Sequence, residues 1–161
     1  MNIRCAAEAD RDAIWRIIEP TIRAGTTYTL DPAMSKADAL SYWMGPDKET
    51  FVAESDQALV GTYYLRANQA GGGAHVGNCG YMTAANAQGS GVARAMCEHS
   101  IAHARERGFR AMQFNFVVST NDRAVRLWHS LGFKTVGRLP AAFRLPSSEY
   151  VDALVMFRAI V

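Results

Sequence analysis

The 161-residue chain has little of what marks several large protein classes. It contains only three cysteines, Cys5, Cys79 and Cys97, which are scattered and form no CxxC pair. A set of this kind argues against a disulfide framework and a cysteine zinc site, so we expect a reducing, cytoplasmic setting. No apolar run approaches the ~20 residues of a membrane span, and the N-terminal segment has no hydrophobic signal region.

The chain also lacks an excess of charge of either sign. Its 17 basic and 15 acidic side chains give a formal net charge of +2, whereas binding through nucleic-acid phosphates requires a dedicated basic face. Apolar residues make up 49% and charged residues 20%, which is typical of a folded globular protein. We therefore expect a soluble protein without nucleic-acid or membrane partners, and residues 1–161 are predicted to form a single domain.

Hydrophobic periodicity and turn residues predict eleven main elements. Helices are expected near 14–22, 35–44, 91–107 and 121–131, and strands near 3–6, 50–53, 58–65, 75–83, 109–118, 133–138 and 151–157. The resulting order, β-α-α-β-β-β-α-β-α-β-β, indicates an α/β (α+β) fold with a mixed sheet and helices on both faces.

Four local features sharpen this prediction. Pro20 lies inside the first apolar helical stripe, so that helix is expected to bend or restart there. The glycines of residues 68–73 predict a hairpin connection, and Gly108 is expected to end the long helix. In the strand near 109–118, the alternation places Met112, Phe114 and Phe116 on one face.

A glycine-rich segment, QGSGVAR at residues 88–94, lies between a predicted strand and the long helix. At a helix N-terminus such a segment lets backbone N–H groups converge, and the helix dipole adds positive potential. That arrangement suits a pyrophosphate, with Arg94 supplying a charge-assisted contact. The other interpretation is an ordinary glycine-rich helix cap. The segment lacks the GK[ST] ending of a Walker loop and does not follow the first strand as a dinucleotide motif does.

Two motifs resemble those of the GCN5-related N-acetyltransferase (GNAT) family. Gln88, Gly91 and Ala93 match the signature [RQ]xxGx[GA], and residues 121–133, NDRAVRLWHSLGF, are similar to N-x-x-A-x-x-L-Y-x-x-x-G-F. Both motifs occur in the family's order with a predicted strand between them. The resemblance implies acetyl-CoA as co-substrate, no metal, a mostly antiparallel sheet of six to seven strands, and a possible homodimer.

The resemblance also implies which residues bind the cofactor. Asn121 would both cap its helix and contact the pantetheine, although a cap alone remains an alternative. The backbone of Tyr81, Met82 and Thr83 would bind the thioester carbonyl and the pantetheine, where an N–H stabilises developing negative charge. The pyrophosphate would contact Gln88, Gly89, Ser90, Gly91, Val92, Ala93 and Arg94.

The residues that would transfer protons are less well defined. Position 128 is Trp where the family usually has the Tyr assigned as general acid, and an indole N–H cannot deliver a proton at physiological pH. Trp128 is therefore expected to pack against the cofactor or the core. No carboxylate occurs in residues 75–81 to serve as general base, which leaves Tyr81, Cys79, or a water held by Asn115 or Asn78. From this set we predict Tyr81 and Asn115 as catalytic residues.

The acceptor is expected to contact Tyr28, in the loop 24–34, and Asn115, which is otherwise a satisfied structural amide. The region around residues 127–156 looks like a subgroup that includes acetyltransferases for proline analogues such as azetidine-2-carboxylate. This implies direct acetyl transfer to a small amino or imino acid in a ternary complex. Alternatives are acetylation of a protein amine and a non-catalytic acyl-CoA sensor. His99 and His103 share a helix face, but they are expected to face solvent, since a third zinc ligand is not evident.

Overall fold

The computed structural model describes residues 1–161 and confirms the predicted order of elements. The four helices are α1 (Arg11–Ala24), α2 (Lys36–Trp43), α3 (Val92–Glu106) and α4 (Asp122–Ser130). The seven strands are β1 (Asn2–Cys5), β2 (Glu49–Ser55), β3 (Ala58–Ala67), β4 (Val76–Thr83), β5 (Ala111–Val118), β6 (Lys134–Arg144) and β7 (Tyr150–Ala159). Short 3-10 turns occupy Glu8–Asp10, Gly71–Gly73 and Ala85–Ala87.

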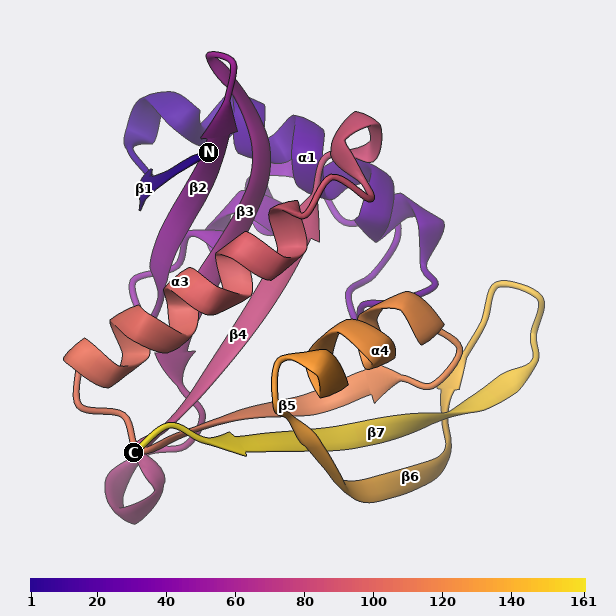
Figure 1. Cartoon of the computed structure of the whole chain (residues 1–161). Coiled ribbons are helices and arrows are strands. Elements are labelled where there is room, and N and C mark those ends of the chain that lie inside the picture. Colours follow the sequence, from indigo (N-terminus) through magenta and orange to yellow (C-terminus); the bar gives the residue numbers. More distant parts are fainter.

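The strands form one mixed, mostly antiparallel sheet in the order β1-β2-β3-β4-β5-β7-β6. The only parallel neighbours are β4 and β5, and they pair at just two positions, Val76 with Ala111 and Gly77 with Met112. Beyond these pairs the two strands diverge, as Figure 1 shows. The divergence opens the middle of the sheet toward the C-terminal end of β4.

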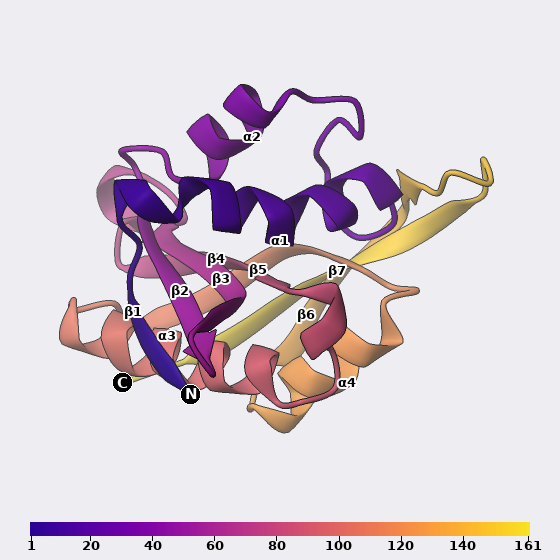
Figure 2. The ribbon, with the colours of Figure 1, turned by 90° about the horizontal axis from the view of Figure 1, so that it is seen from above.

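Two helical layers cover the sheet. Figure 2 shows α1 and α2 over one face and α3 and α4 over the other. The stripe predicted in the first helix is confirmed, since Ile14, Ile17, Ile18 and Ile22 are all buried against the sheet. The helix does not restart at Pro20, because α1 runs through it to Ala24. Gly108, with φ of +85°, ends α3 as expected.

The structure corrects one predicted face of β5. The β5–β7 register shifts between Phe114 and Val117, so the strict alternation is broken there. Met112, Phe114 and Val117 pack into the core beneath α3 and α4, whereas Phe116 contacts the separate cluster of Val118, Phe143 and Val151. Phe116 is thereby placed on the α2 side of the sheet, where it borders the site described below.

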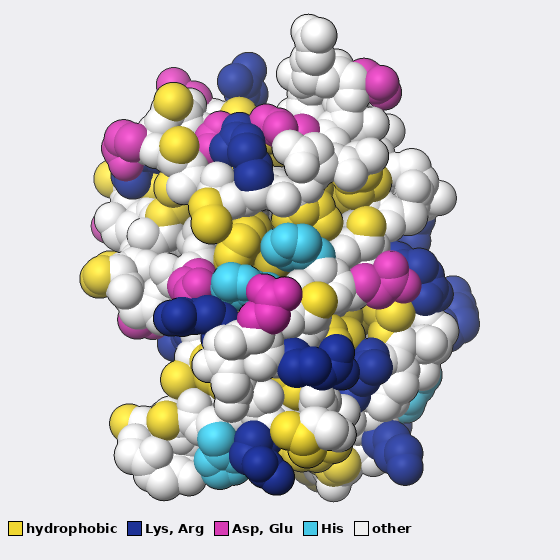
Figure 3. Space-filling model, turned by 60° about the vertical axis from the view of Figure 1, so that its left-hand side comes forward, with side chains coloured by type: hydrophobic (Ala, Val, Ile, Leu, Met, Phe, Trp, Pro, Cys, Tyr) yellow, Lys and Arg dark blue, Asp and Glu magenta, His cyan; other side chains and the backbone are white.

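The surface reflects the near balance of charge in the sequence. On the face shown in Figure 3, acidic side chains lie among basic ones over the upper and middle parts, whereas the lower part shows basic side chains and no acidic ones. None of the helices is both long and apolar enough to cross a membrane.

Candidate active site

The segment between β4 and α3 forms a cradle of free backbone N–H groups. Gly89 and Gly91 have φ of +84° and +85°, a left-handed conformation that side chains with a Cβ rarely adopt. The first hydrogen bond of α3 is donated by the Ala95 N–H to the Gly91 carbonyl. The preceding N–H groups of Val92, Ala93 and Arg94 therefore remain available to a ligand at the positive end of the helix.

This cradle forms one end of a cavity of about 620 Å³. Its only charged lining side chains are Arg94 and Arg123, both basic, and Arg123 approaches so closely that a Cβ on Gly89 would lie 2.9 Å from its guanidinium. Free N–H groups, a helix dipole and two guanidinium groups suit a pyrophosphate. The cavity continues along α1, the loop after α1 and the end of β4, with lining residues that include Pro20, Thr21, Thr26, Thr27, Met82 and Thr83. These residues fit an elongated cofactor with an anionic end, as acetyl-CoA is.

The edge of β4 that faces the divergence carries backbone groups that are not paired with a neighbouring strand. The Tyr28 hydroxyl lies 2.8 Å from both the backbone nitrogen and the carbonyl oxygen of Tyr81, accepting from the first and donating to the second. Both groups of Tyr81 thus point away from β3. Because backbone direction alternates along a strand, the N–H and C=O groups of Cys79 and Thr83 point to the same open edge.

A second cavity, of about 260 Å³, lies in the divergence between β4 and β5. It shares Thr27, Tyr28, Tyr81 and Asn121 with the first cavity, so the two meet at the Tyr28–Tyr81 contact. Most of its other lining residues are apolar or aromatic, and its only charged lining residue is Arg66. The arrangement provides one long compartment and one small compartment that join at an exposed strand edge.

The structure brings together most of the residues predicted to bind the cofactor. Met82, Thr83 and Asn121 line the first cavity with Gln88, Gly89, Gly91, Val92, Ala93 and Arg94. Ser90 is not among the lining residues, because its hydroxyl turns back to donate to the Ala87 carbonyl at 2.6 Å. Trp128 is also displaced from the expected position, since it lines the second cavity and not the first.

Two of these side chains have partners within the protein. Asn121 accepts a hydrogen bond from the Ala124 N–H at 3.3 Å, which confirms it as the cap of α4. The Arg94 guanidinium donates to the Ser130 hydroxyl at 2.8 Å. The guanidinium is thereby directed toward the C-terminal end of α4, and a contact to the cofactor would require it to exchange this partner.

The environment of the Tyr81 side chain argues against the predicted role of general base. The Tyr81 hydroxyl bonds the Ser100 hydroxyl at 2.7 Å, and its ring packs against Trp128 and Phe114. Burial of the hydroxyl raises the pKa of Tyr81 well above its ordinary value, which favours the protonated phenol. The backbone of Tyr81, not its phenol, belongs to the site.

Asn115 lines the second cavity, as predicted, but its amide already has protein partners. Its Nδ2 donates to Asn68 at 2.6 Å, and its Oδ1 accepts from Gln113 at 3.0 Å. These two bonds fix the amide at the wall of the cavity. The alternative of a satisfied structural amide is therefore observed, while the wall position leaves contact with the acceptor as a prediction.

The remaining candidates for proton transfer or nucleophilic attack are unsuited to those roles. Burial raises the pKa of the Cys79 thiol, which keeps it protonated and unreactive. Asn78 donates its amide to the Gln113 carbonyl at 2.9 Å, bridging the point where β4 and β5 separate. Trp128, 8% exposed, packs with Tyr81, Phe114 and Phe133, which favours the packing role over proton delivery.

Several lining residues were missed at the sequence level. Arg66, Tyr42 and Tyr64 border the second cavity, and Arg123 borders the first. Alternation in β3 places Tyr64 and Arg66 on one face, which is the only sequence signal that groups them. Arg123 falls inside the second motif, where its proximity to Gly89 depends on the tertiary packing of α4.

The two histidines of α3 lie outside this site. His99 bonds the Tyr63 hydroxyl at 2.7 Å, and His103 bonds Glu49 at 2.8 Å. The expectation that they simply face solvent is thus incomplete, because each has a specific partner. No group of three or more His, Cys, Asp or Glu side chains is arranged to hold a metal ion.

Comparison with known proteins agrees with the geometry. Residues 13–133 match the model of the acetyltransferase (GNAT) family. A GCN5-related N-acetyltransferase from Kribbella flavida has 42% identity and a TM-score of 0.92, covering 98% of this chain and 96% of that one. N-acetyltransferase aca1 of Schizosaccharomyces pombe is 28% identical over 151 residues, 83% of this chain and 72% of its own length. YncA of Salmonella typhimurium, a putative acetyltransferase solved with acetyl-CoA, has 22% identity and a TM-score of 0.88, covering 100% and 94% of the two chains.

The family match spans three quarters of the sequence and includes the cradle, the open edge of β4 and the cap of α4. The fold, the strand divergence and the cavity chemistry agree with it. The chain therefore belongs to the acetyltransferase (GNAT) family and is an N-acetyltransferase that depends on acetyl-CoA.

Proposed function

We propose that the protein acetylates the amine of a small molecule, an amino or imino acid, by direct attack while both substrates are bound. The observation that carries this proposal is the junction of the two cavities at Tyr28 and Tyr81. The larger cavity suits acetyl-CoA, and the smaller, at about 260 Å³, lies below the usual range of ligand sites, ~300–1,000 Å³. A small acceptor fits such a compartment better than a segment of polypeptide does.

Acetyl-CoA supplies an acetyl group that is activated as a thioester. The cradle at residues 89–94 holds its anionic end, and the open edge of β4 presents N–H groups where the carbonyl is expected. The acceptor amine attacks from the second cavity, so that a C–N bond forms as the C–S bond breaks. The amine proton leaves to solvent, and the sulfur departs as a thiolate, which a thiol pKa of ~8.5 makes feasible without an acid at Trp128.

Within this class we propose that the acceptors include proline analogues such as azetidine-2-carboxylate. The support is the resemblance around Trp128 and in residues 136–156, together with the aromatic and apolar lining of the second cavity. A compact ring carrying an amine presents apolar surface to such a lining.

The experiment that tests the function is acetyl-CoA-dependent thiol release by the purified protein. The panel contains amino acids, imino acids, polyamines and a lysine peptide, with an amine-free control. We expect turnover on one or more small amino or imino acids and little on the peptide. Turnover confined to the peptide would favour a protein acceptor, and firm acetyl-CoA binding without any turnover would favour a sensor.

We further propose a cytoplasmic homodimer. Free thiols at Cys79 and Cys97 in the core support a reducing compartment. The sheet edge at β6, with Val136 and Leu139 exposed, supports an association surface. Sedimentation equilibrium tests the dimer, and a monomer at micromolar concentration would contradict it.

A further inference from the structure

We propose that Arg66 binds the carboxylate of the acceptor in the second cavity. This assignment rests on the proposed function and adds the residue that selects an acceptor with an anionic group next to its amine. It stands on four observations: an unpartnered buried donor, a weakly held guanidinium, its place in the same small cavity as Tyr28 and Tyr81, and the absence of any other charge in that cavity.

The Nε of Arg66 is buried and has no hydrogen-bond partner, and it is the only buried side-chain nitrogen or oxygen in the protein in this condition. Leaving a buried donor unpaired is costly, so such groups usually have a partner or await one. The Arg66 side chain as a whole is 33% exposed and lines the second cavity. A carboxylate bound there side-on, by Nε and one terminal nitrogen together, would supply that partner.

The nearest acid does not neutralise this guanidinium effectively. Asp47 Oδ2 lies 3.5 Å from Nη1 of Arg66, at the limit of a hydrogen bond. The same carboxylate is bonded by Lys48 Nζ at 3.0 and 3.2 Å. Because Lys48 already neutralises Asp47, Arg66 retains donors for a second carboxylate, and the planar guanidinium can bind one in bidentate fashion.

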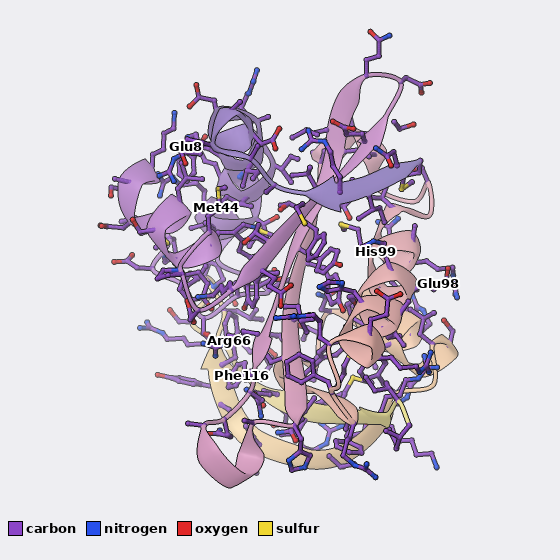
Figure 4. All side chains as sticks on the ribbon, turned by 90° about the vertical axis from the view of Figure 1, so that its left-hand side faces the viewer. Glu8, Met44, Arg66, Glu98, His99 and Phe116 are labelled. Atoms are coloured by element: carbon purple, nitrogen blue, oxygen red, sulfur yellow. The ribbon has the colours of Figure 1, made fainter.

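The position of Arg66 relative to the junction suits an amino acid. Arg66 is paired with Asn78 on β4, three residues from Tyr81, a separation of ~10 Å along the strand. Arg66, Tyr28 and Tyr81 all line the same cavity of about 260 Å³, so an acceptor that contacts both the guanidinium and the junction must be small. Figure 4 shows Arg66 close to Phe116, on the side of the sheet opposite His99.

The rest of the lining defines the remainder of the acceptor. No other charged side chain borders the second cavity, so a second charged group on the ligand would lack a counter-charge there. Phe116, Val118 and Trp128 provide apolar surface. The inferred acceptor is therefore a small α-amino or α-imino acid with an apolar body.

The test compares carboxylate-bearing acceptors with their neutral counterparts. L-Proline, L-alanine and L-methionine are each assayed beside the corresponding amide, with wild-type protein, R66Q, R66K and the control R110Q. Arg110 is exposed, makes no side-chain bond and borders neither cavity. Thermal melting confirms that each variant is folded, and the KM for acetyl-CoA reports the state of the first cavity.

Wild-type protein and R110Q are expected to prefer the free acid over the amide. R66Q should raise KM for the acid at least about tenfold, the loss typical of a hydrogen bond to a charged group, while leaving kcat, the KM for acetyl-CoA and the rate on the amide unchanged. R66K should restore part of the preference, because it keeps the charge without the bidentate fork.

Two results would overturn the inference and leave the proposed function standing: equal wild-type rates on acid and amide, or an undiminished preference for the acid in R66Q. Absence of turnover on every acid and amide would instead overturn the proposed function, and the inference with it. A fall in kcat for acid and amide alike in R66Q would show a general structural effect and also contradict carboxylate binding.

Discussion

The hydroxyl of Tyr28 bridges the backbone nitrogen and carbonyl oxygen of Tyr81 at 2.8 Å each, where the two cavities meet. Tyr28 comes from the loop after α1, and Tyr81 belongs to the open edge of β4. The Tyr28 hydroxyl therefore forms hydrogen bonds with the two backbone groups that would pair with β5 if the strands did not diverge. Burial raises the pKa of Tyr28, so the hydroxyl keeps the proton that it donates.

Removing this hydroxyl is expected to destabilise the protein. In Y28F two partly buried backbone groups lose their partner, and we expect a decrease of about 1 kcal/mol in the free energy of unfolding. Urea denaturation measures it. Y150F is the matched control, because Tyr150 is 62% exposed and its hydroxyl has no hydrogen bond. Equal stability of the two variants would show that the bridge contributes nothing.

The left-handed backbone at Gly91 is expected to be required for cofactor binding. G91A must place a Cβ at φ of +85°, which costs about 1–2 kcal/mol even though the space around it is open. Relief of that strain would move the cradle. A loss of ~1 kcal/mol in the binding free energy would weaken acetyl-CoA binding about fivefold.

G108A provides the control for this experiment. Gly108 has the same φ and equally open surroundings, but it ends α3 far from the cradle. It should lose similar stability and bind acetyl-CoA normally by calorimetry. Equal loss of affinity in both variants would contradict a specific role of the cradle.

Direct attack predicts that Cys79 is dispensable. It lines the second cavity beside the junction, but burial raises the pKa of its thiol and leaves it a poor nucleophile. C79S should keep kcat within about threefold of wild type, because no covalent acetyl-enzyme is formed. Accumulation of an acetylated protein by intact mass spectrometry, abolished in C79S, would refute direct attack.

The pH dependence of the reaction is expected to follow the acceptor and not the enzyme. No carboxylate or histidine lines the second cavity, and burial raises the pKa values of Tyr28, Tyr64, Cys79 and Tyr81. Below the pKa of the acceptor amine, kcat/KM should rise about tenfold per pH unit as the amine loses its proton. With two acceptors of different amine pKa, the midpoint should move by that difference. A midpoint fixed near neutral pH for both would reveal an enzymic base.

Lowering the pH is expected to remove the stability that the Asp10 carboxylate contributes near the N-terminus. Asp10 is 9% exposed and accepts bonds from Arg4 and from the Ala7 N–H, and the Arg4 bonds hold its pKa below its ordinary value. Since the folded-state pKa is the lower one, this contribution is complete above pH ~4 and is lost as the pH falls through the folded-state pKa.

D10N should therefore cost about 2 kcal/mol at pH 7, and the difference from wild type should shrink in acid. D12N, at an exposed pair with Lys36, is the control and should change little. Chemical denaturation at pH 7 and pH 3 measures both variants. A D10N deficit that is independent of pH would contradict this origin of the stability.

Local patterns were sufficient to predict much of this molecule. The α1 stripe, the glycine end of α3, the cap at Asn121 and the loop at residues 88–94 each depend on neighbours within a few residues. The order of elements and two spaced motifs then indicated the family. Features that could not be predicted from the sequence depend on tertiary geometry: the register shift that turns Phe116, the burial of the Tyr81 phenol, and the bond of Arg94 to Ser130.

Arg66 could not be assigned from the sequence for the same reason. Its place in a strand is evident from alternation, but its role depends on the divergence of β4 from β5 and on the prior pairing of Asp47 with Lys48. The divergence has no local signature, and the adjacent residues Asp47 and Lys48 do not show in the sequence that Arg66 lies beside them. The structure therefore adds most to the sequence-based prediction on the acceptor side of the site.

Acetyl-CoA and a small amine are expected to occupy the joined cavities at the same time. The most direct test is an initial-rate matrix with both substrates varied, using the best acceptor of the panel and measuring thiol release. Simultaneous occupancy of the two cavities predicts intersecting double-reciprocal lines and no release of thiol before the acceptor is added. Parallel lines, with a stoichiometric burst of thiol from acetyl-CoA alone, would contradict it.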